Sequence, residues 1–300
     1  MNQRQPISII IPAYNRARII SATLESILEQ TYQYWECIVV DDNSQDDTTD
    51  VVRSFEERDN RFHLLTNEHK KGAQGARNTG ILHSKYDWII CFDSDNTMHP
   101  DMLMRLSANI SDKIDVVQCF STIVDANTNE VIGEQNWISE GYIHEKLFEV
   151  NGATWETYVD FNQSIVRKNT LLEIGMLDES CPSMQEWDTH IRLSKIARYT
   201  TLRESLLDYS LNGADAITSD KRREVAGRLY ILQKYNDEWH KDTNTLKNYL
   251  EQICMYIHGC KNMQQRLSLV WKLLRIEPVA VFAIMSFFKR KIIRVIQNRL

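Results

Sequence analysis

Asp93-Ser94-Asp95 contains the residues best suited to chemistry in this chain, and it follows an apolar run, 88–92, that is typical of a buried strand. Two carboxylates separated by one residue in a turn can share a hard divalent cation, and Mg²⁺ and Mn²⁺ prefer such oxygen ligands. The alternative is a structural turn, because Asp and Ser are common where strands end. Taken alone, the motif favours the structural turn.

Short apolar runs and helical patterns alternate over the first 120 residues. Strands are expected at 7–11, 37–40, 62–66 and 88–92, with helices around 20–28, 51–55 and 75–82. This alternation predicts an α/β fold of parallel βαβ units with helices on both faces of the sheet. Ligands of such sheets lie beyond the carboxyl ends of the strands. Polar clusters follow three of the strands, and we expect them to converge on one edge; they are 12–15, 41–44 and 93–96.

Five segments resemble, in order and at family spacing, the N-terminal half of the family 2 glycosyltransferases. They are residues 8–15, 26–31, 38–46, 72–80 and 88–95. The resemblance implies a GT-A type nucleotide-diphospho-sugar transferase fold, which is a Rossmann-like, mostly parallel sheet with helices on both faces. It also makes metal binding the favoured interpretation of Asp93 and Asp95, with Mn²⁺ or Mg²⁺ as cofactor.

The resemblance implies a role for each matching residue of the nucleotide half. Residues that hold the nucleotide are Pro12, Ala13, Tyr14, Asp42, Arg77, Asp93 and Ser94, and the metal ligands are Asp93 and Asp95. Asp42 matches the acid that hydrogen-bonds the base, and a carboxylate there suits an N–H donor such as the uracil imide. The expected donor is therefore a UDP-sugar.

The acceptor half resembles the family less closely. Around residues 185–193 the family places a catalytic acid before an aromatic residue, and family 2 enzymes are inverting. One carboxylate must then remove the acceptor proton as the oxygen attacks the anomeric carbon. Glu186 is the first candidate for this base and Asp188 the second. Aromatic and histidine side chains of this half are more typical of packing than of sugar stacking; they are Trp137, Trp155, Trp187, His144 and His190.

Three positions depart from the family pattern. Asn96 stands where another acid often follows the metal motif, and Ser210 and Asn212 stand where the family has Arg and His near the diphosphate. A basic run, Lys221-Arg222-Arg223, either replaces these groups or is an exposed basic face. These departures keep open the alternative of a catalytically inactive homologue that binds a nucleotide sugar.

Domain organisation is expected to comprise a glycosyltransferase domain at 1–218 and a helical C-terminal extension at 219–300. The first domain divides into a nucleotide-binding half, 1–120, and an acceptor half, 121–218. From Val270 to Leu300 there are seven basic residues and one acid. Two interpretations of this tail remain open: an amphipathic helix in a membrane headgroup region, or a terminal helix docked on the domain.

The bulk composition narrows the function classes. A net charge of −6 argues against a nucleic-acid partner. None of the six cysteines forms a CxxC pair, so reduced, mostly buried thiols are expected. No signal peptide and no stretch long enough to span a bilayer is visible, which predicts a cytoplasmic protein. The first strand is followed by Pro12-Ala13-Tyr14 and not by a glycine-rich loop, which disfavours nucleotidyltransferases and dinucleotide oxidoreductases.

Together these observations predict an inverting, metal-dependent hexosyltransferase that moves a sugar from a UDP-sugar to an acceptor hydroxyl. The resemblance points to bacterial surface-polysaccharide synthesis, such as O-antigen, capsule or exopolysaccharide. The expected acceptor is a glycan or a lipid-linked saccharide, and the expected location is the cytoplasm, with peripheral contact to the cytoplasmic face of the inner membrane.

Overall fold

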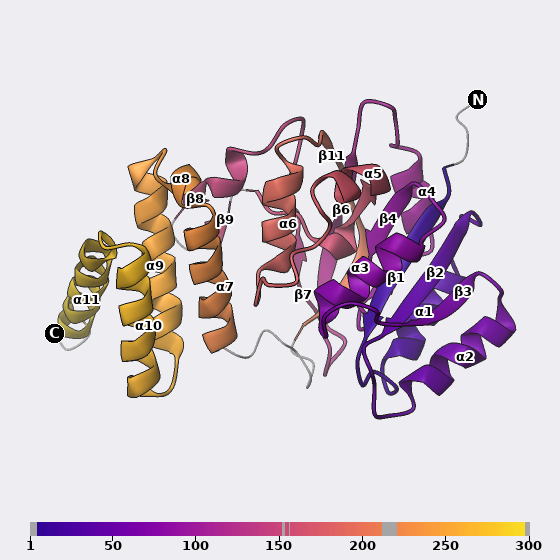
Figure 1. Ribbon diagram of the computed structural model, residues 1–300, viewed down its shortest axis with the longest axis horizontal. Coiled ribbons are helices and arrows are strands. Elements are labelled where there is room, and N and C mark those ends of the chain that lie inside the picture. The colour runs from indigo at the N-terminus through magenta and orange to yellow at the C-terminus, as the bar shows by residue number, and fades with distance from the viewer. Residues whose placement is uncertain (1–4, 152–153, 156, 212–220, 298–300) are drawn as a thin grey trace. The chain divides into compact units, whose positions relative to one another are not determined.

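The computed structural model describes residues 5–151, 154–155, 157–211 and 221–297. They belong to two compact units, each described by itself below (Figure 1). Unit 1 comprises Met1–His144, Tyr158–Glu179 and Thr189–Ala216. Unit 2 comprises Glu145–Thr157, Ser180–Asp188 and Ile217–Leu300. Asn212, one of the positions that depart from the family pattern, lies outside the described residues. The same is true of residues 219–220, the expected start of the helical extension.

Unit 1 is built on a nine-stranded mixed sheet. Its strands are β1 (Ile7–Ala13), β2 (Trp35–Asp41), β3 (Phe62–Thr66), β4 (Trp88–Cys91), β5 (Thr97–Met98), β6 (Val116–Asp125), β7 (Val131–Gln135), β10 (Ser164–Arg167) and β11 (Tyr199–Leu211). Its helices are α1 (Ile20–Leu28), α2 (Thr48–Arg58), α3 (Ala73–His83), α4 (Met102–Ser107), the 3₁₀ helix η2 (Phe161–Gln163) and α5 (Lys168–Glu173).

The strand order is β3-β2-β1-β4-β10-β6-β11-β5, with β7 pairing to β6. The first four strands are parallel, and Ala13 is in register with Asp41 while Ile10 is in register with Cys91. The carboxyl ends of β1, β2 and β4 are therefore neighbours. The second half is mixed, because β10 runs antiparallel to both β4 and β6 whereas β11 runs parallel to β6.

Alternate residues of β1 explain how the sheet is covered. Ile7, Ile9 and Ile11 pack into a core with the apolar faces of α1, α2 and α4. Ile10 points the other way and meets α3, where Gly80 lies against it. A strand buried on both faces needs the continuous β-branched run that the sequence shows.

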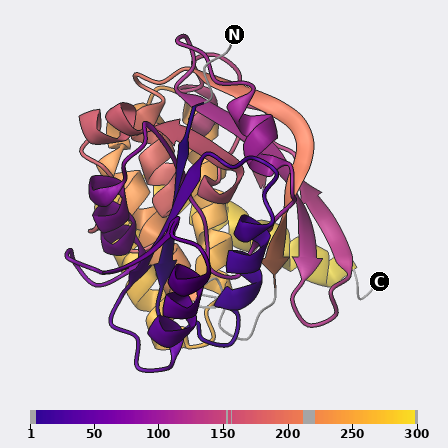
Figure 2. The same cartoon turned by 90° about the vertical axis from the view of Figure 1, so that its right-hand side faces the viewer.

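The expected elements of the nucleotide half are present, with bounds that differ by a few residues at their ends. In the part of unit 1 that follows residue 115, β6 and β7 form an antiparallel pair. Strand β11 was not predicted; its register shifts at Leu202–Ser205 and Ser205–Asp208 interrupt the alternation by which strands are recognised. Figure 2 shows its strong curvature.

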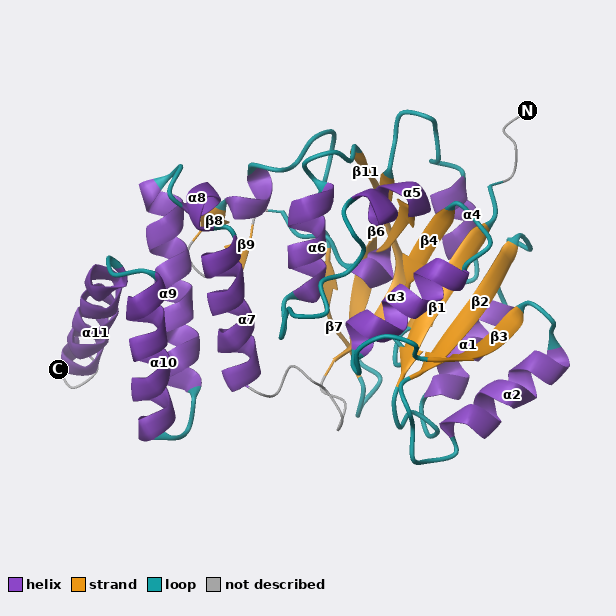
Figure 3. Ribbon diagram, viewed as in Figure 1, coloured by secondary structure: helices purple, strands orange, loops and turns teal. Residues whose placement is uncertain are grey.

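Unit 2 is mainly helical, as expected for the C-terminal part (Figure 3). Its elements are the 3₁₀ helix η1 (Lys146–Phe148), the pair β8 (Val150–Asn151) and β9 (Thr154–Trp155), and the helices α7 (Lys221–Lys234), α8 (Asn236–Trp239), α9 (Thr243–Gly259), α10 (Met263–Ile276) and α11 (Ala280–Gln297). Helix α6 (Gln185–Leu193) begins in unit 2 and ends in unit 1. Aromatic side chains form the core of unit 2. Trp239 stacks on Tyr249 with 4.1 Å between ring centroids, and Trp187 packs against both rings.

Two expectations from composition can be compared with the structure. All six cysteines are buried, in agreement with the burial expected for them. In the described ranges, every helix falls short of the length or apolar character that crossing a bilayer requires.

Replacing Gly80 by Ala tests the packing of α3 on β1. A Cβ at Gly80 would lie 2.4 Å from Cγ2 of Ile10, whose side chain is fully buried. The helix propensity of Ala favours the change by up to about 1 kcal/mol, but overpacking costs about 1–3 kcal/mol. Gly80→Ala should therefore lower the free energy of unfolding by about 1 kcal/mol, measured by urea denaturation.

Gly259→Ala is the matched control, since its Cβ would meet only Lys221 side-chain atoms at 3.9 and 4.0 Å. This variant should be neutral or slightly stabilised. A Gly80→Ala protein as stable as the Gly259→Ala protein would contradict the close approach of α3 to β1.

Candidate functional site

The carboxylate of Asp42 lies at the end of β2 and is nearly buried, with 5% of the residue exposed. The backbone N–H of Asp42 donates to the Ala13 carbonyl at 2.8 Å, which ties the ends of β1 and β2 together. Asn67 Nδ2 donates to Asp42 Oδ1 at 2.7 Å, and the Gly72 N–H donates to Oδ2 at 2.8 Å. Each oxygen thus accepts one of these hydrogen bonds and has a second lone pair that can accept another.

The loop that Asp42 holds needs two glycines. Gly72 has a φ of 128°, a conformation that favours glycine, directly before α3. A Cβ at Gly75 would lie 1.9 Å from the Lys70 carbonyl oxygen, so only glycine lets the loop lie against the first turn of α3. Sequence reasoning missed Asn67, whose Oδ1 also accepts hydrogen bonds from the His69 N–H and the Thr79 hydroxyl.

The ring of Tyr14 is open to solvent at the end of β1, with 42% of the residue exposed. Lys71 Nζ lies 4.3 Å from the ring centroid, close enough for a cation–π contact. Pro12 is half-buried and Ala13 is buried. Because the Ala13 carbonyl receives the Asp42 N–H, the residues expected to hold a base lie together at one edge of the sheet.

Asp93 is held from two sides. Arg77, which is 3% exposed on α3, donates from Nη2 to Asp93 Oδ1 at 2.6 Å. Asn162 of η2 donates from Nδ2 to Asp93 Oδ2 at 2.9 Å, and its Oδ1 accepts the Asp93 N–H at 2.7 Å. Asp160 orients Asn162, because its Oδ1 accepts both the backbone N–H and Nδ2 of Asn162 at 2.8 Å. Sequence reasoning found Arg77 and missed Asn162 and Asp160, since amide side chains in a loop follow no periodic pattern.

Asp95 lies beside this held carboxylate and is open to solvent on one side. Desolvation by the surrounding protein and, to a smaller extent, the negative charge of Asp93 raise the pKa of Asp95 to about 6, although the Arg16 guanidinium opposes this change. A further positive charge near both carboxylates would relieve their repulsion. In the described ranges no group of three or more His, Cys, Asp or Glu side chains could hold a metal ion. A Mg²⁺ or Mn²⁺ ion at Asp93 and Asp95 would also accept substrate oxygens and water as ligands.

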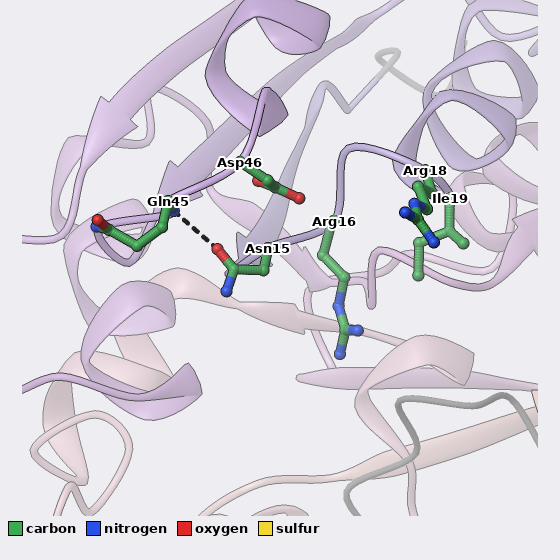
Figure 4. A pocket seen from close by; sticks show the side chains of 6 residues that line it. All are labelled: Asn15, Arg16, Arg18, Ile19, Gln45 and Asp46. Atoms are coloured by element: carbon green, nitrogen blue, oxygen red, sulfur yellow. Dashed lines mark hydrogen bonds between the residues drawn. The ribbon is translucent and has the colours of Figure 1, made fainter.

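An open recess of about 340 Å³ lies at the β1–α1 loop (Figure 4). It is lined by Asn15, Arg16, Arg18, Ile19, Gln45 and Asp46. The loop is fixed by the neighbouring turn, because the Gln45 N–H donates to Asn15 Oδ1 at 2.8 Å and Asp46 Oδ2 accepts the Ala17 N–H at 3.1 Å. Arg16 brings a positive charge both to this recess and to Asp95.

Two of the three departures from the family pattern, Asn96 and Ser210, are linked to each other. Asn96 is 1% exposed, and its Oδ1 accepts the Ser210 N–H of β11 at 2.9 Å. Its carbonyl accepts the Thr23 hydroxyl at 2.8 Å. The amide at position 96 therefore joins the end of the acidic motif to β11, a bond that a carboxylate could also accept. Ser94, expected in the nucleotide site, is buried.

The two candidates for a catalytic base differ in their surroundings within unit 2. Glu186 is half-buried in the first turn of α6. Asp188 is fully buried; Lys234 Nζ lies 2.7 Å from its Oδ1, and the Tyr235 hydroxyl donates to the same oxygen at 2.8 Å. The carboxylate of Asp188 therefore joins α6 to Lys234 of α7 and to Tyr235, the residue that follows α7.

Other polar and aromatic side chains of the acceptor half have packing roles. Trp187 is 1% exposed and donates from Nε1 to the Leu147 carbonyl at 3.1 Å. His190 is fully buried beside the Tyr199 hydroxyl, and burial lowers the pKa of His190 to about 3, so the ring stays neutral. His144 contacts the Ser194 hydroxyl at 2.8 Å. The side chain of Trp155 lies outside the described part of the chain.

The basic run at the start of α7, which belongs to unit 2, contacts other residues of the same unit. Arg223 donates from Nε to the Pro182 carbonyl at 2.8 Å, and Lys221 Nζ lies 5.2 Å from the centroid of the Tyr256 ring. These contacts agree with a structural role for the run.

Comparison with known proteins gives matches in both sequence and structure. Residues 8–170 match the family described as Glycosyl transferase family 2. WfaP of Escherichia coli, named a UDP-Glc:alpha-D-GlcNAc-diphosphoundecaprenol beta-1,3-glucosyltransferase, is 44% identical over 236 residues, covering 78% of this chain and 88% of WfaP. Three other curated relatives are matched over only 36%, 41% and 49% of their own length, so the chain spans half or less of those proteins.

Two solved structures share the fold at low sequence identity. TarS 1-349 of S. aureus in complex with UDP-GlcNAc has a TM-score of 0.60 and 16% identity, over 95% of this chain and 88% of that one. The mannosyltransferase PcManGT of Pyrobaculum calidifontis, in complex with GDP-Man and Mn²⁺, has a TM-score of 0.61 and 14% identity, over 100% and 89%. They agree with the predicted GT-A type α/β fold and its C-terminal helices. With one family matched over more than half of the residues, and a relative matched over most of its length, the chain belongs to glycosyltransferase family 2.

Proposed function

We propose that this chain is an inverting, metal-dependent hexosyltransferase that moves a sugar from a UDP-sugar to a lipid-linked saccharide. The proposed setting is bacterial surface-polysaccharide synthesis at the cytoplasmic face of the inner membrane. Family membership supports the reaction class, and the name of WfaP, which specifies a glucosyl donor and a diphosphoundecaprenol-linked acceptor, supports the acceptor class.

The observation that carries the proposal is the pair Asp93 and Asp95. Asp93 is oriented by Arg77 and Asn162, and the repulsion between the two carboxylates favours a divalent cation between them. Mn²⁺ or Mg²⁺ at this pair would neutralise charge on the departing nucleoside diphosphate. The bound Mn²⁺ of PcManGT, a protein with the same fold, is in keeping with such a site.

Uracil recognition is proposed for Asp42 with Tyr14. The remaining acceptor capacity of Asp42 suits the imide N–H of uracil, and the exposed face of Tyr14 suits stacking against a base. TarS, which shares the fold, was solved with UDP-GlcNAc, whereas PcManGT was solved with GDP-Man. Arg16, in the neighbouring recess, is the cation best placed to approach a diphosphate beside Asp95.

Glu186 is proposed as the base that takes the proton of the acceptor hydroxyl. A base must reach its substrate, and the half-buried Glu186 meets this requirement better than Asp188. The carboxylate of Asp188 is fully buried and compensates the charge of Lys234. Proton removal by Glu186 would let the acceptor oxygen attack the anomeric carbon as the bond to the nucleoside diphosphate breaks, which inverts the configuration.

Asp95→Ala should abolish metal-dependent transfer and leave the fold intact. Loss of a carboxylate ligand removes several kcal/mol of charge stabilisation, so transfer should fall by more than about a hundredfold. Isothermal titration with Mn²⁺ and UDP, beside an assay of UDP-sugar turnover, measures both effects. The control is Asp112→Ala, which removes an exposed acid outside the site.

Full activity in Asp95→Ala would rule out the proposed metal site. In the unchanged chain, Mn²⁺ binding should weaken as the pH falls through about 6, because the proton competes for Asp95. Tight binding of UDP and Mn²⁺ without turnover of any donor would instead support the inactive homologue.

Asn162→Asp should weaken Mn²⁺ binding while retaining the acceptor for the Asp93 N–H. The change replaces the Nδ2 donor with a carboxylate oxygen facing Asp93 and Asp160. Partners of metal ligands typically contribute about 10–100-fold in affinity, so a loss of that size is expected by titration. Asn136→Asp, at an exposed position, is the control; equal affinities in the two variants would exclude a positioning role for Asn162.

Glu186→Gln should lower turnover by about 10²–10⁴-fold with little change in UDP affinity. Asp188→Asn should act on stability instead, because breaking a buried ion pair costs about 3–5 kcal/mol. Turnover numbers, UDP titration and thermal unfolding of both variants separate these effects. If Asp188→Asn unfolds like the unchanged chain and loses turnover, while Glu186→Gln stays active, the base is Asp188.

A further inference from the structure

Helix α10 carries an apolar row on its exposed face. Met263, Leu267 and Trp271 are spaced by four residues and therefore lie along one side of the helix. Their exposed fractions are 64%, 56% and 66%. The opposite side, with the buried Leu269 and Leu273, faces the interior of unit 2, where α10 contacts α7 and α9. A large apolar row left outside in this way marks an interaction surface more often than a packing defect.

Helix α11 is docked on one side and apolar on the other. Its Ser286 hydroxyl donates to Glu251 Oε1 at 3.3 Å, and Phe287 packs against His258, both on α9. The docked-helix interpretation of the tail therefore agrees with this part of α11. On the outer side, Phe282 is 72% exposed and Met285 is 65% exposed. Docking thus leaves an apolar face uncovered.

The two exposed faces are close along the chain. Only residues 277–279 separate α10 from α11, and the two helices contact each other (Figure 3). Val279, in this connection, is 46% exposed. We use the name α10–α11 surface for Met263, Leu267, Trp271, Val279, Phe282 and Met285.

The sequence that carries the α10–α11 surface is strongly basic. Lys272, Arg275 and Lys289 are exposed. Glu277 is the one acid in the sequence from Lys261 to Leu300, against nine basic residues. It is 3% exposed, and its Oε2 lies 3.2 Å from Nε2 of His240. Aromatic and aliphatic side chains interleaved with basic ones, without exposed acids, are typical of proteins that bind at the interface of an anionic membrane.

We propose that the α10–α11 surface binds the headgroup region of an anionic lipid bilayer. Charge complementarity favours lipid over a second copy of this chain, because a symmetric contact through this surface would bring its basic side chains together. The proposal deepens the proposed function, since a lipid-linked acceptor lies at such a bilayer. Membrane binding is nevertheless measurable without sugar transfer, so failure of one does not imply failure of the other.

Sedimentation with vesicles tests the proposal on the full chain. The probes are phosphatidylcholine vesicles with about 30% phosphatidylglycerol and vesicles of phosphatidylcholine alone. The chain should bind the anionic vesicles much more strongly, and added salt should weaken that binding. Trp271→Ser with Phe282→Ser should lower the partition coefficient by roughly tenfold or more. Lys272→Glu with Arg275→Glu should also lower the partition coefficient. Loss of one basic charge lowers it by roughly fivefold, and reversal of two charges should lower it by more than that.

Matched controls change similar side chains elsewhere. Leu82→Ser with Met104→Ser removes two exposed apolar side chains of unit 1, and Lys113→Glu with Lys195→Glu reverses two exposed charges there. Both controls should bind vesicles like the unchanged chain. UDP-sugar hydrolysis in solution should be equal in all variants, which shows that each one folds.

Two outcomes would overturn the proposal. The first is equal binding of the unchanged chain to anionic and neutral vesicles, or binding that the α10–α11 variants retain. The second is a dimer by sedimentation equilibrium that dissociates in these variants, with no vesicle binding by the unchanged chain, since the surface would then pair two copies.

Discussion

The geometry of the candidate site depends on the carboxylate of Asp93. Arg77 reaches it from α3 and Asn162 from η2, so two elements distant in sequence meet at the end of β4. A buried guanidinium and a buried amide would be costly without partners, and Asp93 provides one for each. The same bonds keep one carboxylate fixed while Asp95 remains open beside it. Repulsion between a fixed and an open acid is the electrostatic basis for the proposed cation binding.

Much of this arrangement could be predicted from the sequence because it follows regular patterns. The β-branched runs of β1, β2 and β4 identify buried parallel strands, and parallel strands bring their carboxyl ends together. Asn67 and Asn162 could not be found in this way, because each acts through a side-chain amide in an irregular segment. Strand β11 was missed for a related reason: its irregular pairing with β6 interrupts the alternation of apolar and polar residues.

The choice between Glu186 and Asp188 shows a second limit of sequence reasoning. Both acids lie in the first turn of α6, and their order in the sequence carries no information on exposure. Tertiary packing distinguishes them, because α7 brings Lys234 to the oxygen of Asp188. The C-terminal tail is similar, since its amphipathic pattern fits a docked helix and a membrane-facing helix equally. Helix α11 packs on α9 with one side and leaves Phe282 and Met285 exposed on the other. A docked helix can therefore still carry an exposed apolar face.

The hydrogen bonds of Asp42 have a consequence for any redesign of the proposed base pocket. Its carboxylate closes the loop before α3, where it accepts from Asn67 and from the Gly72 backbone. A side chain without acceptor oxygens at position 42 would leave both of these donors without an acceptor, at the cost of unsatisfied buried groups. In the proposed base pocket, position 42 therefore serves both the base and the loop conformation. A change of residue 42 has to be accompanied by a redesign of residues 67–72.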